Sequence, residues 1–94
     1  MDMGYFRKNI DQRLNDYKLV YSSYPDGDFG SLERVIIEGR NKIAGVDIWS
    51  KGWLNIDIYD MALGEQVMNI LLDPTEVQEQ KEAINKLMEV LLNE

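Results

Sequence analysis

Residues 44–60 read AGVDIWSKGWLNIDIYD, and this stretch decides the fold that the sequence predicts. Two runs of alternating apolar and polar residues flank the short segment 50–52, a pattern typical of two antiparallel strands joined by a tight turn. Because successive strand residues point to opposite faces of a sheet, the length of this turn decides which side chains share a face.

A loop formed by residues 50–52 gives the hairpin one wholly apolar face. Gly52 then takes the position of positive φ, as in a hairpin that closes through a G1 bulge. The apolar face opposes Ile48 with Leu54, Val46 with Ile56 and Ala44 with Ile58. A two-residue loop would mix the two sets of side chains, for example by placing Val46 against Asp57. Since burial of one face fixes the register, the longer loop is expected.

The second face of the hairpin carries aromatic and acidic side chains. Its cross-strand pairs are Trp49 with Trp53, Asp47 with Asn55, Gly45 with Asp57 and Ile43 with Tyr59. Tryptophan and tyrosine are common anchors of protein interfaces, and carboxylates favour a basic partner. We therefore predict a partner-binding surface made by Asp47, Trp49, Trp53, Asn55, Asp57 and Tyr59. The alternative is that the N-terminal helix covers these rings, since the apolar side of that helix must be buried somewhere.

Further strands are expected on both sides of the hairpin. The run 32–39 can return through Arg40 and Asn41, a register that sets Ile37 against Ala44, Val35 against Val46 and Arg34 against Asp47. A last strand, roughly residues 66–72, offers Met68, Ile70 and Leu72 to the same core. The β-prone run 18–24 forms either a first strand or an extended lead into the sheet.

The stretch YPDGDFGS, residues 24–31, suggests chemistry but predicts a turn. Asp-Gly is a strong turn signal, and Pro25 disfavours helix at Tyr24. An EF-hand loop starting at Asp26 would need glycine and glutamate where Ser31 and Ile37 stand. The kinase reading of Asp-Phe-Gly fails because the chain is too short and has no phosphate-binding loop.

Both ends of the chain predict helices. At the N-terminal end, Phe6, Ile10, Leu14 and Tyr17 recur with the spacing of one helix face, and Asp2 is a candidate N-cap. The segment 73–76, Asp-Pro-Thr-Glu, predicts a capping aspartate, proline at the first helical position and glutamate at N3. The apolar stripe of the C-terminal helix is expected to consist of Val77, Ile84, Leu87, Met88 and Leu91, with Leu92 at its edge.

The sequence thus predicts a single α+β domain spanning residues 1–94. It consists of an N-terminal helix, an antiparallel meander of four to five strands and a C-terminal helix packed on the sheet. That helix is expected to cover the apolar face formed by Val35, Ile37, Val46, Ile48, Ile56, Ile58 and Met68.

The charge of the chain is unevenly distributed. The net charge is −7, and residues 1–42 carry seven acids and seven bases. Residues 43–94 carry ten acids and three lysines, so 3 − 10 = −7 and the whole excess lies there. An acidic surface repels nucleic acid and anionic lipid and attracts basic proteins. We expect a basic protein partner, and neither nucleic acid nor a membrane.

Catalytic and metal-binding side chains are scarce. The chain contains no histidine and no cysteine, which removes the imidazole base, the thiolate nucleophile and the usual zinc ligands. We therefore expect no enzyme activity, no cofactor and no metal. The weaker alternatives are acid–base chemistry by Asp47 and Asp57, or magnesium or calcium binding by these residues with Asp60. The lack of cysteine, of an export signal and of a long apolar run favours a cytoplasmic location.

The stretch RVIIEGRNKIAGVDIWSKGWLNIDIYD, residues 34–60, contains Asp-x-Trp and Gly-Trp within a strand–turn–strand core. Together with the acidic C-terminal helix, it resembles the small immunity proteins of bacterial toxin systems, of the contact-dependent inhibition and polymorphic-toxin type. The resemblance covers roughly residues 33–92. It implies a cytosolic, non-catalytic protein that binds a cognate toxin domain, often a basic nuclease, and blocks its active site. The alternative is a small structural or regulatory module that forms a homodimer through a free sheet edge or the tryptophan face.

Overall fold

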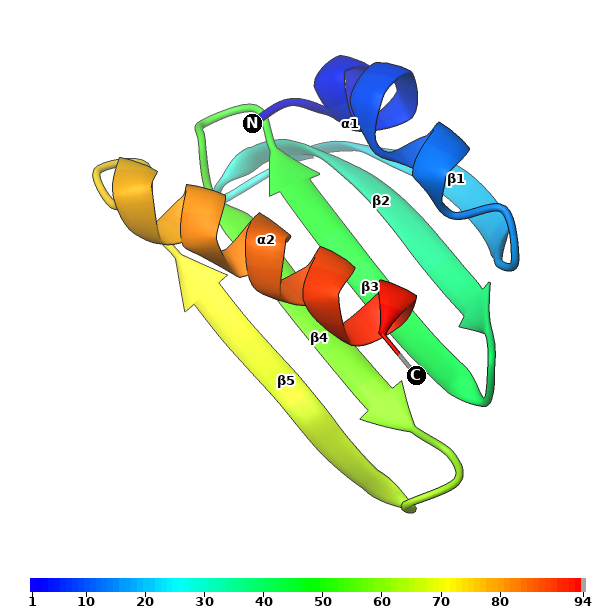
Figure 1. Cartoon of the computed structure of the whole chain (residues 1–94). Coiled ribbons are helices and arrows are strands. Elements are labelled where there is room, and N and C mark those ends of the chain that lie inside the picture. The colour runs from blue at the N-terminus through cyan, green and yellow to red at the C-terminus, as the bar shows by residue number, and fades with distance from the viewer. Residues whose placement is uncertain (94) are drawn as a thin grey trace.

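The computed structural model describes residues 1–93, which form an α+β fold built on one antiparallel sheet (Figure 1). A short helix and a 3-10 turn precede five strands, and a long helix follows them. In chain order the elements are α1 (Met3–Asn9), η1 (Asp11–Arg13), β1 (Lys18–Gly27), β2 (Gly30–Gly39), β3 (Lys42–Trp49), β4 (Leu54–Asp60), β5 (Glu65–Leu72) and α2 (Val77–Leu92).

The strands form a meander in the order β1-β2-β3-β4-β5, so each strand pairs with its neighbours in sequence. The register predicted from residues 44–60 is confirmed, because Ile48 lies opposite Leu54 and Gly52, in the β3–β4 loop, has the expected positive φ, 98°. The β2–β3 register is confirmed as well. Arg40 and Asn41 make that turn with φ of 48° and 61°, the left-handed region that a two-residue type I′ hairpin needs.

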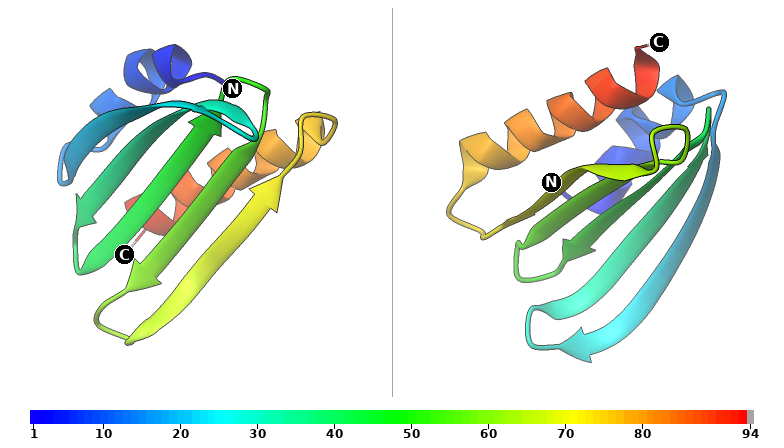
Figure 2. Two further views of the ribbon diagram at one scale, coloured as in Figure 1. Left: turned by 180° about the vertical axis from the view of Figure 1, so that it is seen from behind. Right: turned by 90° about the horizontal axis from the view of Figure 1, so that it is seen from below.

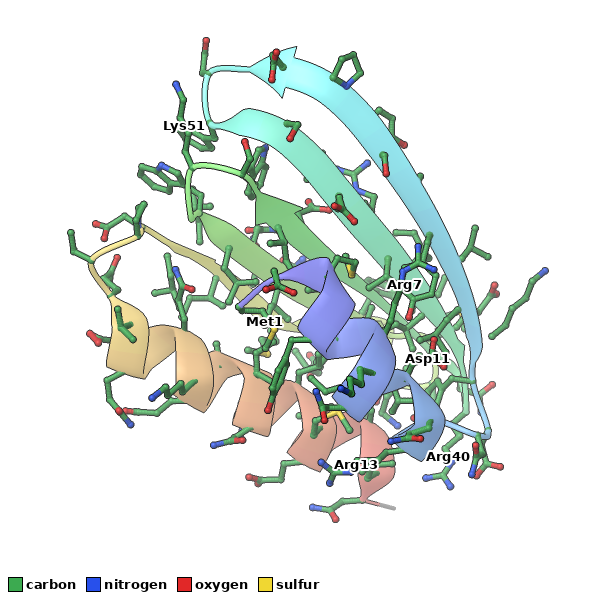
Figure 3. All side chains as sticks on the ribbon, turned by 90° about the horizontal axis from the view of Figure 1, so that it is seen from above. Met1, Arg7, Asp11, Arg13, Arg40 and Lys51 are labelled. Carbon is green, nitrogen blue, oxygen red and sulfur yellow. The ribbon has the colours of Figure 1, made fainter. Side chains whose placement is uncertain are left out.

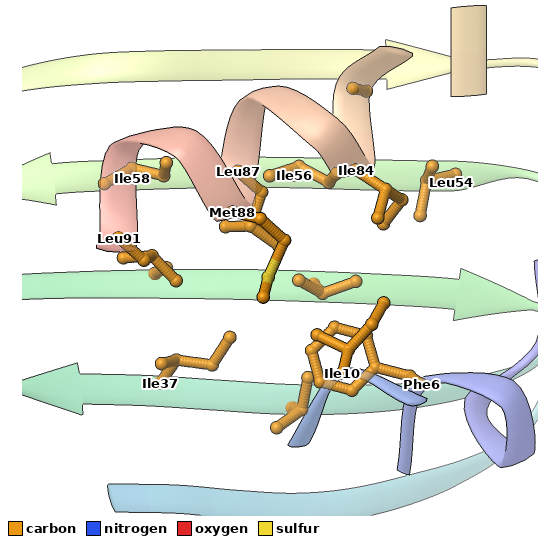
Figure 4. Packing of buried hydrophobic residues seen from close by; sticks show 14 of the residues in the cluster. Phe6, Ile10, Ile37, Leu54, Ile56, Ile58, Ile84, Leu87, Met88 and Leu91 are labelled. Carbon is orange, nitrogen blue, oxygen red and sulfur yellow. The ribbon is translucent and has the colours of Figure 1, made fainter. Parts of the chain in front are cut away.

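Both helices lie on the same face of the sheet, and the opposite face carries no helix (Figure 2). The buried side chains of α1 and α2 join those of the sheet in one core, in which Phe6 and Ile10 lie beside Leu87 and Met88 (Figure 4). The alternative in which the N-terminal helix covers the tryptophan face is therefore excluded. Instead, α1 extends the layer that α2 begins, which leaves the second face of the sheet open.

The N-terminal segment buries the predicted stripe, although less of it is α-helical than its spacing suggests. Phe6, Ile10, Leu14 and Tyr17 are all buried, but the α-helix ends at Asn9 and a 3-10 turn carries the chain onward. Asp2 caps the helix as expected, since its carboxylate accepts a hydrogen bond of 2.8 Å from the Tyr5 amide. Figure 3 shows Arg7 and Asp11 on the side of this segment that faces β1.

Helix α2 begins later than its capping signal predicts. Asp73 accepts hydrogen bonds from Thr75 and the Glu76 carboxylate accepts one from the Asp73 amide, but these bonds close a turn before the helix, which starts at Val77. The placement of Val77 in the apolar stripe is wrong, because its side chain is 57% exposed. Its place on the buried side is taken by Gln80, whose amide donates to the carbonyls of Gly52 and Asp73.

Candidate partner-binding surface

The open face of the sheet presents side chains from all five strands. The register aligns them in rows that cross the sheet, one of which runs from Val20 through Ile36, Gly45 and Asp57 to Asn69. The next row contains Ser22, Arg34, Asp47, Asn55 and Leu71. The six residues predicted as a partner-binding site lie together in β3, β4 and the loop between them, on or beside this face.

Asp47 is the most buried member of the predicted site. Its side chain is held by Arg34 of β2, whose Nε lies 2.6 Å from one carboxylate oxygen and whose Nη2 lies 3.2 Å from the other. This hydrogen bond raises the pKa of Arg34 further above its usual value. Because both oxygens accept hydrogen bonds from Arg34 and the residue is only 7% exposed, Asp47 holds the Arg34 side chain in place and is itself poorly accessible to a partner.

Asp57 lies at the centre of the face, and its carboxylate rests over the backbone of Gly45. A Cβ atom at position 45 would lie 3.2 Å from Asp57 Oδ2, so glycine makes room for the acid. Asn55 donates to the same oxygen over 3.4 Å. Burial raises the pKa of the Asp57 carboxyl above its usual value, and the charge of Asp47 raises it further. Among residues 1–93, no cation lies within ion-pair distance of Asp57.

Trp49 and Trp53 form a cluster with Phe29, which the sequence reasoning had left in a turn. The Phe29 ring stacks on Trp53 with centroids 4.2 Å apart and meets Trp49 edge-on at 5.5 Å. The tip of the β1–β2 hairpin is held there by the loop after β3. Ser50 donates to the Ser31 carbonyl over 2.8 Å, and Lys51 donates to the Phe29 carbonyl over 3.1 Å. Both indoles are therefore half-buried.

The stretch 24–31 turns a corner, as predicted, but later than expected. Strand β1 continues to Gly27, with an irregularity in pairing after Tyr24, and only Asp28 and Phe29 lie between the paired glycines Gly27 and Gly30. Because this tip reaches the β3–β4 loop, the Phe29 ring contacts both tryptophans. The alternation of the strands gave no signal for this contact, since it joins two loops.

Exposed apolar side chains on the open face were missed by the sequence reasoning. They come from β1, β2 and β5: Val20, Tyr24, Ile36 and Leu71. Ile43 of β3, which the sequence placed opposite Tyr59 on this face but not in the site, is exposed as well. The signal was present in the run Val35-Ile36-Ile37, where the middle residue must point away from the core that its neighbours enter. Together with the six predicted residues, these four and Ile43 make up what we call the open-face site.

The described residues offer few other sites. A groove of about 620 Å³ separates α1 from α2, and Figure 3 looks onto this side of the molecule. Its lining includes Tyr5, Ile10, Val77, Ile84 and Met88, with Arg13 and Lys81 as charged side chains. Within residues 1–93, no three acidic side chains gather closely enough to hold a metal ion, and neither helix has the length and apolar character to cross a membrane.

Comparison with known proteins found no matching family model, no significantly similar curated protein and no significantly similar solved structure.

Proposed function

We propose that this chain is a non-catalytic binding protein whose open-face site docks a basic protein. The finer proposal, which the resemblance implies, is that the partner is a bacterial toxin domain and that binding neutralises it. The observation that carries the proposal is the uncovered face itself. Two helices share one side of the sheet, while the other side exposes aliphatic and aromatic side chains around Asp57, an acid that forms no ion pair with any of residues 1–93.

The apolar part of the site supports docking of a protein. Exposed Val20, Ile36, Ile43 and Tyr59 form a belt across β1, β2, β3 and β4. Leu71 of β5 lies apart from this belt, opposite Asn55, and Tyr24 lies near the other end of β1. Contiguous apolar patches of this kind on a folded domain commonly mark interaction sites. A partner that covers the belt removes apolar area from water at about 25 cal/mol per Å², less the costs of association.

The charged part of the site selects the partner. Arg34 binds both oxygens of Asp47, and the Asp57 carboxylate beside the belt accepts a hydrogen bond from Asn55 but forms no ion pair with residues 1–93, so a cation from outside can pair with it. An arginine or lysine placed over Gly45 would reach this carboxylate while its stem packs on Ile36 and Ile43. The net charge of −7 would also speed the encounter with a basic protein.

The test is a titration of the purified chain with the protein encoded by the adjacent gene, at low and at physiological salt, by isothermal titration calorimetry. We expect a complex whose affinity falls as salt rises. Tyr59→Ser and Asp57→Asn should each weaken it by about tenfold or more, because they remove the aromatic anchor and the charge of the site.

Matched controls lie on the other side of the molecule. Tyr5, which is 53% exposed on α1, corresponds to Tyr59, which is 44% exposed, and Glu79 of α2 provides an exposed acid far from Asp57. Tyr5→Ser and Glu79→Gln should change the affinity by less than about twofold. Equal losses from the control and the test substitutions would exclude the open face, whereas no complex at low salt would exclude the toxin partner.

A further inference from the structure

Strand β5 forms one edge of the sheet, and this edge lacks the usual protection against pairing with another strand. Its only charged residue is Glu65 at its first position, so residues 66–72 are neutral and contain no proline. Among the described residues, no strand pairs with its outer side, and Figure 1 shows it as the outermost strand. Natural proteins blunt such edges with lysine, proline or irregular pairing, because unpaired N–H and C=O groups are a template for another strand.

The opposite edge is protected. Strand β1 carries Lys18 at its start and Pro25 and Asp26 near its end, and its pairing with β2 is irregular after Tyr24. Strand β5 has one irregularity of its own, where Ile58 pairs with Met68 and Tyr59 pairs with Gln66. That irregularity lies near the start of β5, so the stretch from Met68 to Leu72 remains regular. The chain therefore protects one edge of its sheet and leaves the other available.

We propose that two copies of this chain associate through β5, which joins their sheets into one continuous antiparallel sheet. The choice of a second copy follows from charge. A chain of net charge −7 repels itself over most of its surface, but residues 66–72 bring no like charges together. A pairing centred on Ile70 also sets Glu65 opposite Thr75, whereas one centred on Asn69 would set it opposite Asp73. A basic partner would gain no electrostatic attraction from this edge. This pairing uses the outer backbone edge of β5, which adjoins the open-face site and shares Leu71 with it.

Symmetry restricts the pairing. A two-fold axis perpendicular to the sheet keeps the helix-covered faces of both copies on the same side, so residues that oppose each other must point to the same face. The pairing is then centred on a single residue that lies opposite the same residue of the other copy. Two centres are candidates: Asn69, the midpoint of the neutral residues 66–72, and Ile70, the midpoint of the regularly paired residues 68–72. In either register Leu71 lies within two residues of the axis.

The experiment is sedimentation velocity of the isolated chain over a wide range of concentration, with three variants. Leu71→Lys should raise the dimer dissociation constant about tenfold or more, because symmetry introduces two like charges near the axis and removes apolar cross-strand contacts on both sides. Val20→Lys is the matched control, since Val20 is 51% exposed on the β1 edge and Leu71 is 50% exposed on the β5 edge. Tyr59→Lys places the same charge on the open face, away from either edge.

A dimer weakened by Leu71→Lys and changed less than about twofold by the other two variants supports the proposal. Equal weakening by Val20→Lys or Tyr59→Lys would show that the copies meet through β1 or face to face, and would overturn it. A monomer at every concentration up to about 1 mM would overturn it too. Because the chain is measured alone, none of these outcomes bears on the proposed partner of the open face.

Discussion

The hydroxyl of Tyr17 donates a hydrogen bond of 2.5 Å to the backbone carbonyl of Leu91, which joins the N-terminal segment to the last turn of α2. The two residues are 74 positions apart, and the contact is buried. Arg40, in the turn between β2 and β3, donates to the same carbonyl over 3.4 Å. These bonds connect the N-terminal segment and α2 to each other and to the β2–β3 turn, on the side of the sheet where both helices share one core.

Removing the Tyr17 hydroxyl should destabilise the fold. Tyr17→Phe deletes the donor and leaves a buried carbonyl with only the longer bond from Arg40, so we expect a loss of about 1 kcal/mol in the free energy of unfolding, measured with urea. Tyr5→Phe provides the control, because that ring is exposed on α1. A loss for Tyr17→Phe no larger than that of the control would contradict a stabilising role for the contact.

Two glycines of positive φ separate the cost of backbone strain from that of a steric clash. A Cβ at Gly52 would lie 2.9 Å from Pro74 Cβ, whereas one at Gly64 would meet nothing within 4 Å. Gly64→Ala should cost about 1 kcal/mol, the ordinary price of a left-handed alanine. Gly52→Ala should cost at least about 1 kcal/mol more, because the hairpin loop and the lead into α2 must move apart. Urea unfolding of both variants tests the difference, and equal losses would contradict it.

Neutralising Asp57 should stabilise the protein at neutral pH. The pKa of this carboxyl is raised in the folded state, so its charged form costs stability above that pKa, and the cost is relieved as the pH falls and the folded state binds the proton first. Asp57→Asn should therefore raise the urea midpoint at neutral pH and lose this advantage below 3.8, the ordinary value for aspartate. An equal gain at both pH values would show that the charge is not its cause. The same substitution is expected to weaken partner binding, a trade between stability and function.

Phe29 should control the environment of both tryptophans. Phe29→Ala removes the ring that stacks on Trp53 and meets Trp49 edge-on, so the indole emission should shift to longer wavelength and the free energy of unfolding should fall by about 1 kcal/mol. Because the chain contains two tryptophans and both lie in this cluster, fluorescence reports on the cluster alone. Tyr24→Ala, in the same hairpin but without an indole contact among the described rings, should leave the emission unchanged.

Much of the sheet could be predicted because its information is local. The alternation in β3 and β4, the glycine at position 52 and the dipeptide Arg40-Asn41 specify two hairpins whose registers the structure confirms. The ion pair of Arg34 with Asp47 followed from the same register. The contact of Phe29 with the tryptophans did not, because it joins two loops whose relative position depends on how the whole sheet twists.

The sequence by itself determined that the sheet has one aliphatic face and one face with aromatic and acidic side chains, since strand periodicity leaves no other register with a buried side. It also determined where the excess negative charge lies. The sequence also placed the C-terminal helix on the aliphatic face, but only the tertiary structure decided which face the N-terminal helix covers. An amphipathic stripe states that a helix must bury one side, but the choice of surface depends on packing and on distant contacts such as that of Tyr17 with Leu91. The open-face site is exposed because both helices pack on the opposite face of the sheet.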